Sequence, residues 1–202
     1  LQSVAAQSGD QVFEFLTLPS SARANALGGH TVSLVERDPS LIFHNPALLG
    51  GEMDGMINLD YMNYIADVNV GSALFTKAFR ERGAWGAGVH YFHNGKFKGM
   101  DENNQSTGDF TASDIAVNGF FSYDLSERWR GGVSMKFLYS NYDIYTSLGV
   151  CFDAGLSYYN SEKEFSFGVV LKNIGAQLKP YYEDRQKMPW DIQMGISKKM
   201  NH

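Results

Sequence analysis

The sequence has few of the features that mark disulfide-stabilised, metal-binding or nucleic-acid-binding proteins. Cys151 is the single cysteine among the 202 residues, which excludes an intramolecular disulfide and a cysteine metal cluster within them. The formal net charge is −5, whereas nucleic-acid binding needs a concentrated basic face. No apolar run approaches the roughly 18 residues that a membrane-spanning helix needs. We therefore expect no nucleic-acid partner, no metal or other cofactor, and no crossing of a membrane by a helix.

Charge and proline are also sparse, whereas glycine and aromatic residues are abundant. Charged residues make up 19% of the chain, below the usual quarter or so, and there are only 5 prolines. Glycine reaches 21 residues and aromatics 14%. The mean hydropathy of −0.27 is compatible with strands that turn only one face to an apolar environment. The length suffices for one domain with a sizeable core.

Two long stretches, 129–139 and 148–159, alternate between apolar residues and small, polar or charged residues. A period of two over ten or more residues indicates a strand whose faces meet different solvents. Strands of soluble proteins average only about five or six residues. Ten steps of about 3.3 Å, tilted near 40°, rise about 25 Å, the height of the apolar band of an outer-membrane barrel. Because Trp129 and Tyr139 lie at the two ends of the first stretch, we predict an all-β, antiparallel transmembrane β-barrel.

The same alternation extends over most of the chain after residue 55. It predicts eight strands: 56–64, 66–76, 84–93, 114–123, 129–139, 148–159, 165–171 and 190–198. Tight turns are expected near 65–67, 79–83, 124–128 and 160–163, and long loops at 94–109 and 175–188. Long loops of such barrels face the cell exterior, so we expect the loop 94–109 outside.

Residues 7–54 alternate too little to form barrel wall. Val4 and Ala6 fit the −3 and −1 places of a small-residue cleavage site, so residues 1–6 are interpreted as a signal-peptide remnant. Residues 7–54 are then expected to form an N-terminal plug inside the barrel, and residues 55–202 its strands. An eight-stranded barrel is filled by its own side chains. We therefore expect an incomplete barrel, about eight strands of a larger one, with further strands beyond His202.

Local motifs in the plug predict short helices. Ser20 or Ser21 is a suitable N-cap for a helix over 22–27, which Gly28 and Gly29 would end. Asp38 before Pro39 predicts a second helical turn, because proline is favoured at the first helical position. That turn is expected to end before Asn45, since a residue followed by proline, here Pro46, is disfavoured in a helix.

The plug motifs also carry a resemblance to a known family. Residues 19–29, Pro-Ser-Ser-Ala-Arg-Ala-Asn-Ala-Leu-Gly-Gly, resemble the N-terminal signature of FadL-like outer-membrane barrels linked to type IX secretion. Residues 38–49, Asp-Pro-Ser-Leu-Ile-Phe-His-Asn-Pro-Ala-Leu-Leu, resemble the plug segment of that group. The segments 110–114, 172–179 and 197–199 are similar to its PorQ branch rather than its PorV branch.

The resemblance implies an integral protein of the Gram-negative outer membrane that is not an enzyme. Members of the PorQ branch are thought to hold a PorZ-like surface protein in a complex that attaches secreted cargo to the cell surface. The alternative function is that of a FadL-like transporter of hydrophobic small molecules. A transporter needs an apolar pocket of roughly 300 Å³ or more between plug and wall, whereas an anchor needs none.

Several residues are candidates for specific contacts between plug and wall. A buried arginine needs an acidic partner, so Arg23 is expected to pair with Asp60, Asp153 or Asp191 on the inner face; the alternative is a solvated arginine on the surface. Lys136 and Asp153 are expected on the inner faces of neighbouring strands, where they could bond across the sheet; an exposed pair of this kind contributes only about 0.2–1 kcal/mol.

Two further patterns leave alternatives open or argue against chemistry. The Asn45-Pro46 turn either locks the plug or acts as a ligand gate, with the locking role favoured. His90 and His93 are three residues apart on a strand and therefore on opposite faces, which is poor geometry for a shared metal. Ser134 and Ser157 are expected on the inner face with no histidine or acid at matching depth on the neighbouring strands, so no activated nucleophile is predicted.

Overall fold

The computed structural model describes residues 12–18, 21–26, 28–29, 31–63, 68–100, 106–142, 145–181 and 186–199. The interpretation of residues 1–6 as a signal-peptide remnant lies outside the described residues. The helical elements are the 3-10 helices η1 (Glu14–Thr17), η2 (Pro39–Phe43), η3 (Pro46–Leu48) and η4 (Gly51–Met53), and the α-helix α1 (Ala22–Ala26). The strands are β1 (Met56–Asn63), β2 (Asn69–Phe79), β3 (Gly83–Met100), β4 (Ser106–Asp124), β5 (Trp129–Tyr142), β6 (Tyr145–Asn160), β7 (Phe165–Lys179) and β8 (Asp191–Lys198).

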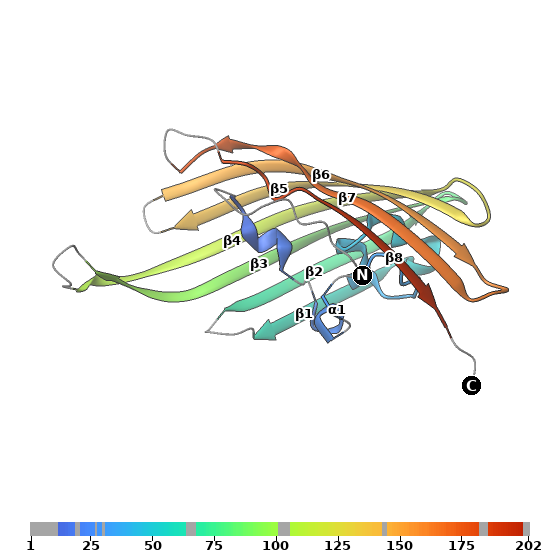
Figure 1. Ribbon diagram of the computed structural model, residues 1–202, viewed down its shortest axis with the longest axis horizontal. Helices are drawn as coiled ribbons and strands as arrows, with labels where there is room; N and C mark the ends of the chain where they lie inside the picture. The colour runs from blue at the N-terminus through green and yellow to red at the C-terminus, as the bar shows by residue number, and fades with distance from the viewer. Residues whose placement is uncertain are drawn as a thin grey trace.

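The strands form one antiparallel sheet in the order of the sequence, so that each strand pairs with the next along the chain. The sheet curls around the short helices of the N-terminal segment, as Figure 1 shows, but it does not close. Within the described chain β1 and β8 are its two edges. The prediction of an all-β antiparallel sheet with eight strands is confirmed, and the sheet has the curvature of a partial barrel.

Several strands are longer than the alternation predicted. The long loop expected at 94–109 is wrong, because β3 and β4 continue as a paired ribbon through Phe97 and Phe110 to Met100 and Ser106. The loop expected at 175–188 is also too long, since β7 continues to Lys179. A strand keeps its backbone hydrogen bonds after its two faces stop meeting different solvents. The side-chain alternation then disappears while the strand goes on, so alternation underestimates strand length.

The short helices of the N-terminal segment are confirmed together with most of their predicted caps. The Ser21 hydroxyl accepts a hydrogen bond from the Ala24 N–H at 3.1 Å, as expected of an N-cap of α1. At the other end of α1 the Gly29 N–H donates to the Ala24 carbonyl at 2.8 Å, and Gly28 and Gly29 both have positive φ. The Asp38 carboxylate accepts from the Ser40 N–H at 2.9 Å and caps η2. No helix in the described ranges is long and apolar enough to cross a bilayer.

The two faces of the sheet differ sharply in exposure. We call the face that contacts residues 12–54 the concave face, and the opposite one the convex face. On β5 the side chains alternate regularly from Gly132 to Ser140, buried on the concave face and exposed on the convex face. On β1 the convex residues Ile57, Leu59 and Tyr61 are all more than 70% exposed. The convex face is therefore a wide apolar surface that nothing in the described chain covers.

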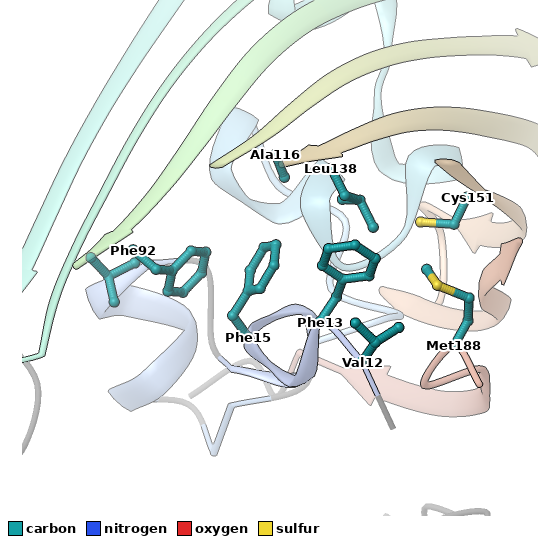
Figure 2. Close-up of a cluster of buried hydrophobic side chains, with 9 residues drawn as sticks. Val12, Phe13, Phe15, Phe92, Ala116, Leu138, Cys151 and Met188 are labelled. Atoms are coloured by element: carbon teal, nitrogen blue, oxygen red, sulfur yellow. The ribbon is translucent and has the colours of Figure 1, made fainter. Parts of the chain in front are cut away.

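Two apolar clusters join the N-terminal segment to the concave face. In the first, Phe13 and Phe15 lie next to Leu138 and Phe92 of the sheet, as Figure 2 shows. The ring centroids of Phe15 and Phe92 are 5.0 Å apart. In the second, residues of η2, η3 and η4 and their flanks pack on β2, β3 and β4; it comprises Ile42, Phe43, Leu49, Met53, Leu74, Ala84 and Phe120. These contacts place the described part of residues 7–54 against the inner side of the curled sheet. We call this part the plug.

Candidate functional site on the concave face

The plug backbone lies directly on glycines of the sheet. Gly132 of β5 and Gly155 of β6 are register partners, and Pro46 lies on both of them. A Cβ atom at Gly132 would overlap the backbone of Pro46 and Ala47, and one at Gly155 would overlap the side-chain oxygen of Asn45. The absence of a side chain at these two positions therefore allows backbone and sheet to touch. The sequence showed small residues on this face but not which of them seat the plug.

Asn45 connects two parts of the plug. Its side chain is fully buried, its oxygen accepts from the Ala47 N–H at 3.0 Å, and its amide donates to the Val32 carbonyl at 2.8 Å. It therefore caps η3, which begins at Pro46, and ties it to the chain thirteen residues earlier. This geometry is that of a structural lock, the role favoured from sequence over a ligand gate.

On the concave face, β5, β6 and β7 share a buried polar network centred on Asp153. Lys136 Nζ lies 2.8 Å from the Asp153 carboxylate and 2.8 Å from the Asn173 side-chain oxygen. The Ser134 hydroxyl donates to Asp153 at 2.9 Å, and the Asn173 N–H donates to its other oxygen at 2.8 Å. Both carboxylate oxygens thus accept hydrogen bonds, as a buried charge requires.

The predicted contact between Lys136 and Asp153 is confirmed, but its environment differs from the prediction. The two side chains are only 6% and 1% exposed, whereas an exposed pair was expected. Removing one partner of a buried pair leaves an uncompensated charge, which costs about 3–5 kcal/mol. The expectation that Ser134 has no acid at matching depth is wrong, since Asp153 is its register partner on β6. The Ser134 hydroxyl donates a hydrogen bond to the Asp153 carboxylate, and Lys136 already neutralises the charge of that carboxylate.

A β-bulge on β7 brings two residues of that strand to the network. The register of β6 and β7 shifts between Phe152 and Ala154, and Asn173 has a φ of 58°. Asparagine tolerates this left-handed conformation better than most residues do. As a result Lys172 and Asn173, neighbours in sequence, are both buried. A bulge re-aims side chains in this way, and a pattern of strict alternation does not predict it.

Lys172 links the bulge to the plug. Its ammonium group donates to the Phe43 carbonyl at the end of η2, at 3.3 Å. Asp191 of β8 is the register partner of Lys172, but its carboxylate accepts from the Gln193 amide at 2.7 Å. Of the three predicted inner-face polar residues, Lys136 and Asp153 thus form an ion pair with each other. Asp191 accepts a hydrogen bond from Gln193 of its own strand.

Arg23 does not pair with the wall. Its guanidinium binds Glu36 and, at 2.7 Å, Asp38, both of which belong to the plug. The predicted pairing with Asp60, Asp153 or Asp191 is wrong. The reason is that Arg23 is half exposed, so it needs no buried partner, and the chain folds the two carboxylates back onto α1. Desolvation lowers the pKa of Arg23, but Asp38 and Glu36 together raise that pKa above its ordinary value.

Two of the spaces that adjoin the plug are lined entirely by described residues. A cavity of about 30 Å³ lies between plug and wall beside His90 and Lys172. A cleft of about 370 Å³ lies at the short turn between β4 and β5, where Arg130 binds Glu52 of the plug at 3.1 Å and Asp124 at 2.5 Å. Although the cleft is large, its charged lining differs from the apolar pocket that the transport hypothesis requires: Glu36, Arg37, Glu52, Asp124, Glu127, Arg128 and Arg130.

No protein-family model and no curated protein matches the sequence. The class of protein therefore follows from the fold alone: an open, curved antiparallel sheet with an apolar convex face and a plugged, polar concave face.

Proposed function

We propose that this chain forms the plug and part of the wall of a FadL-like β-barrel in the Gram-negative outer membrane, where it anchors a PorZ-like surface protein for type IX secretion. The secretion role rests on the resemblance of the plug motifs at 19–29 and 38–49. The membrane location rests on the two faces of the sheet. The alternative is a transporter of hydrophobic small molecules.

The single observation that carries the membrane location is the exposed apolar convex face. A soluble monomer rarely exposes an apolar patch of more than a few hundred Å², and larger patches mark interaction with a membrane or a protein. Here the exposed apolar residues recur on every strand, from Ile57 on β1 to Ile196 on β8. Lipid is the environment that makes such a continuous band favourable, while the polar side chains turn inward.

Aromatic residues are found at both ends of this band. Trp129 and Tyr158 lie at the end with the short turns, with ring centroids 4.9 Å apart. Tyr91 and Tyr139 are exposed at the other end, and both pair with Ile115 of β4. Aromatic girdles at two membrane interfaces have this arrangement.

The ends of the strands support an orientation. The connections after β2, β4 and β6 span 80–82, 125–128 and 161–164, so all three at this end of the sheet are short, whereas at the other end only the connection between β5 and β6, at 143–144, is as short. At the other end the ribbon of β3 and β4 extends past its neighbours, since β2 pairs with β3 only up to His93 and β5 pairs with β4 only from Ala112. Short turns of outer-membrane barrels are periplasmic. The ribbon would then project from the cell surface, where a surface partner docks.

The concave face favours an anchor over a transporter. Of the two described spaces that plug and wall line together, one holds about 30 Å³, a tenth of the volume that a drug-sized apolar ligand needs, and the other, of about 370 Å³, is large enough but is lined by seven charged residues. The plug also rests on Gly132 and Gly155 without intervening side chains. Passage of a hydrophobic molecule would require this contact to separate, whereas anchoring requires it to stay.

Deletion of the gene tests the proposal. We expect secreted cargo to appear in the medium instead of on the cell surface, and a PorZ-like protein to lose its surface attachment. Re-expression of the protein should restore both the surface retention of cargo and the attachment of the PorZ-like protein. A variant that lacks residues 94–111 should still insert into the membrane but should not restore attachment of the PorZ-like protein. Unchanged cargo retention combined with impaired uptake of an apolar compound would contradict the anchor and support the transporter.

A further inference from the structure

The small cavity between plug and wall is lined by hydrogen-bond donors and aromatic rings, and by no carboxylate. Its volume is about 30 Å³. Lys136, Lys172, His90 and Asn118 reach it from the sheet, and Phe43 reaches it from the plug. A cavity of this size holds a particle as large as one or two water molecules. Its chemistry is therefore that of a site for one small, electron-rich particle.

The two lysines of this cavity differ in how their charges are neutralised. Lys136 is paired with Asp153 at 2.8 Å. Lys172 has a single hydrogen bond, to the uncharged carbonyl of Phe43 at 3.3 Å, and no carboxylate in the described chain lies within 4.0 Å of its ammonium nitrogen. An ammonium group has three donors. Lys172 is 7% exposed, so part of its hydrogen-bonding capacity is buried without a partner, and its charge is balanced only by Asp153 and Asp191 from beyond 4.0 Å.

His90 supplies a second, independent indication of a ligand. The residue is 8% exposed, and its Nε2 atom is buried with no hydrogen-bond partner among the described residues. Its ring is held in place by Phe43, at a centroid distance of 3.8 Å, and by Phe92, at 5.9 Å. A rigid imidazole nitrogen without a partner is costly in a folded interior, since a buried polar group needs a hydrogen bond.

We propose that this cavity binds a halide-sized monovalent anion, such as chloride, between Lys172 and His90. A water molecule would satisfy hydrogen bonds but would leave the Lys172 ammonium without a direct ionic contact, since Asp153 and Asp191 attract it only from beyond 4.0 Å, whereas an anion supplies both. The apolar walls made by Phe15, Phe43 and Phe92 suit an anion that loses its hydration shell easily. Because plug and wall both line the cavity, the bound anion stabilises the seated plug. This inference is independent of the proposed secretion role.

Diffraction locates the ion. Crystals of the purified full-length protein grown with sodium bromide should show one anomalous peak within hydrogen-bond distance of Lys172 Nζ and His90 Nε2. Electron density without anomalous signal at that place would assign a water molecule and overturn the proposal. An ion at exposed lysines alone would overturn it as well.

Thermal unfolding tests the ion in solution against a general salt effect. Sulfate stabilises folded proteins by exclusion from their surface, but it is too large for this cavity. At constant ionic strength, the Tm in bromide minus the Tm in sulfate should be several degrees larger for the wild type than for His90→Phe, because a ligand that binds only the folded state stabilises it. Equal differences in the two proteins would overturn the proposal, since the exclusion of sulfate acts on both alike.

Variants separate the site from the remainder of the protein. Lys172→Met and His90→Phe should each abolish both the bromide peak and the bromide-dependent rise in Tm. Lys163→Met, at an exposed position in the turn after β6, should retain both. If Lys172→Met does not fold, His90→Phe decides alone, since it keeps an aromatic ring against Phe43. A bromide effect that survives in His90→Phe would exclude this site.

Discussion

The two faces of the sheet carry out different tasks with residues that alternate along the same strands. On β5, Val133 is 53% exposed on the convex face, whereas Ser134 and Lys136 are buried on the concave face. The convex residues share one property, apolarity, and any similar side chain satisfies it. The concave residues each meet a particular partner, such as Asp153 for Lys136 or Ala47 for Gly132. We therefore expect a substitution on the convex face to be tolerated when it keeps the side chain apolar, and one on the concave face only when it keeps the contact with the particular partner.

The largest effect is expected at the buried network of the concave face. Asp153→Ala would leave the Lys136 charge buried without its partner, and we expect a loss of about 3–5 kcal/mol in the free energy of unfolding. Denaturant titration of the purified protein measures it. The double variant Asp153→Leu/Lys136→Met, which removes both charges, should recover much of the loss. Equal losses in the single and the double variant would show that the ion pair is not what the site requires.

The convex face should tolerate shape changes but not charge. Val133 lies midway between Trp129 and Tyr139, so Val133→Arg places a charge near the middle of the apolar band. We expect a cost of about 2–4 kcal/mol for the protein folded into lipid bilayers. The control Leu125→Arg, at the exposed turn after β4, should cost about 0–1 kcal/mol because it lies at the interface. Similar costs at both positions would contradict a membrane around this face.

Glycines on the two faces offer a matched comparison. Gly132→Ala adds a Cβ atom that overlaps the plug backbone, and overpacking of this kind costs about 1–3 kcal/mol. Gly119→Ala adds the same atom on the exposed convex side, where nothing lies within 4 Å. We expect little change there, and increased protease cleavage of the plug only in Gly132→Ala. Equal behaviour of the two variants would argue against the plug seat.

The smallest effect is expected at Arg23. Arg23 and Glu36 are about half exposed, although Asp38 is only 13% exposed, and pairs with a solvated partner contribute about 0–1 kcal/mol. Arg23→Ala should therefore lower stability only slightly, and by less at high salt, where the charges are screened. Chemical denaturation at low and high ionic strength measures both. A loss comparable to that of Asp153→Ala would indicate a role for Arg23 beyond the plug.

Features that depend on neighbouring residues were predictable from the sequence, and features that depend on distant ones were less so. The caps at Ser21 and Asp38 and the glycines that end α1 are local; Ser21 was one of two predicted candidates, and the other features were predicted at their residues. The partners of Arg23 were predicted wrongly, because a long side chain in a loop-rich segment has several carboxylates within reach. Lys136 and Asp153 were paired correctly since regular alternation placed both on the inner face of adjacent strands.

The sequence by itself determined that the chain forms long antiparallel strands with one apolar face, since a strand turns successive side chains to opposite sides. It also determined the short helices of the plug through their capping residues. Only the tertiary structure decided where the plug rests, because the overlap at Gly132 depends on residues more than eighty positions earlier in the chain. It likewise decided the bulge that brings Lys172 to Phe43, since an extra residue in a strand interrupts the alternation on which sequence reasoning depends.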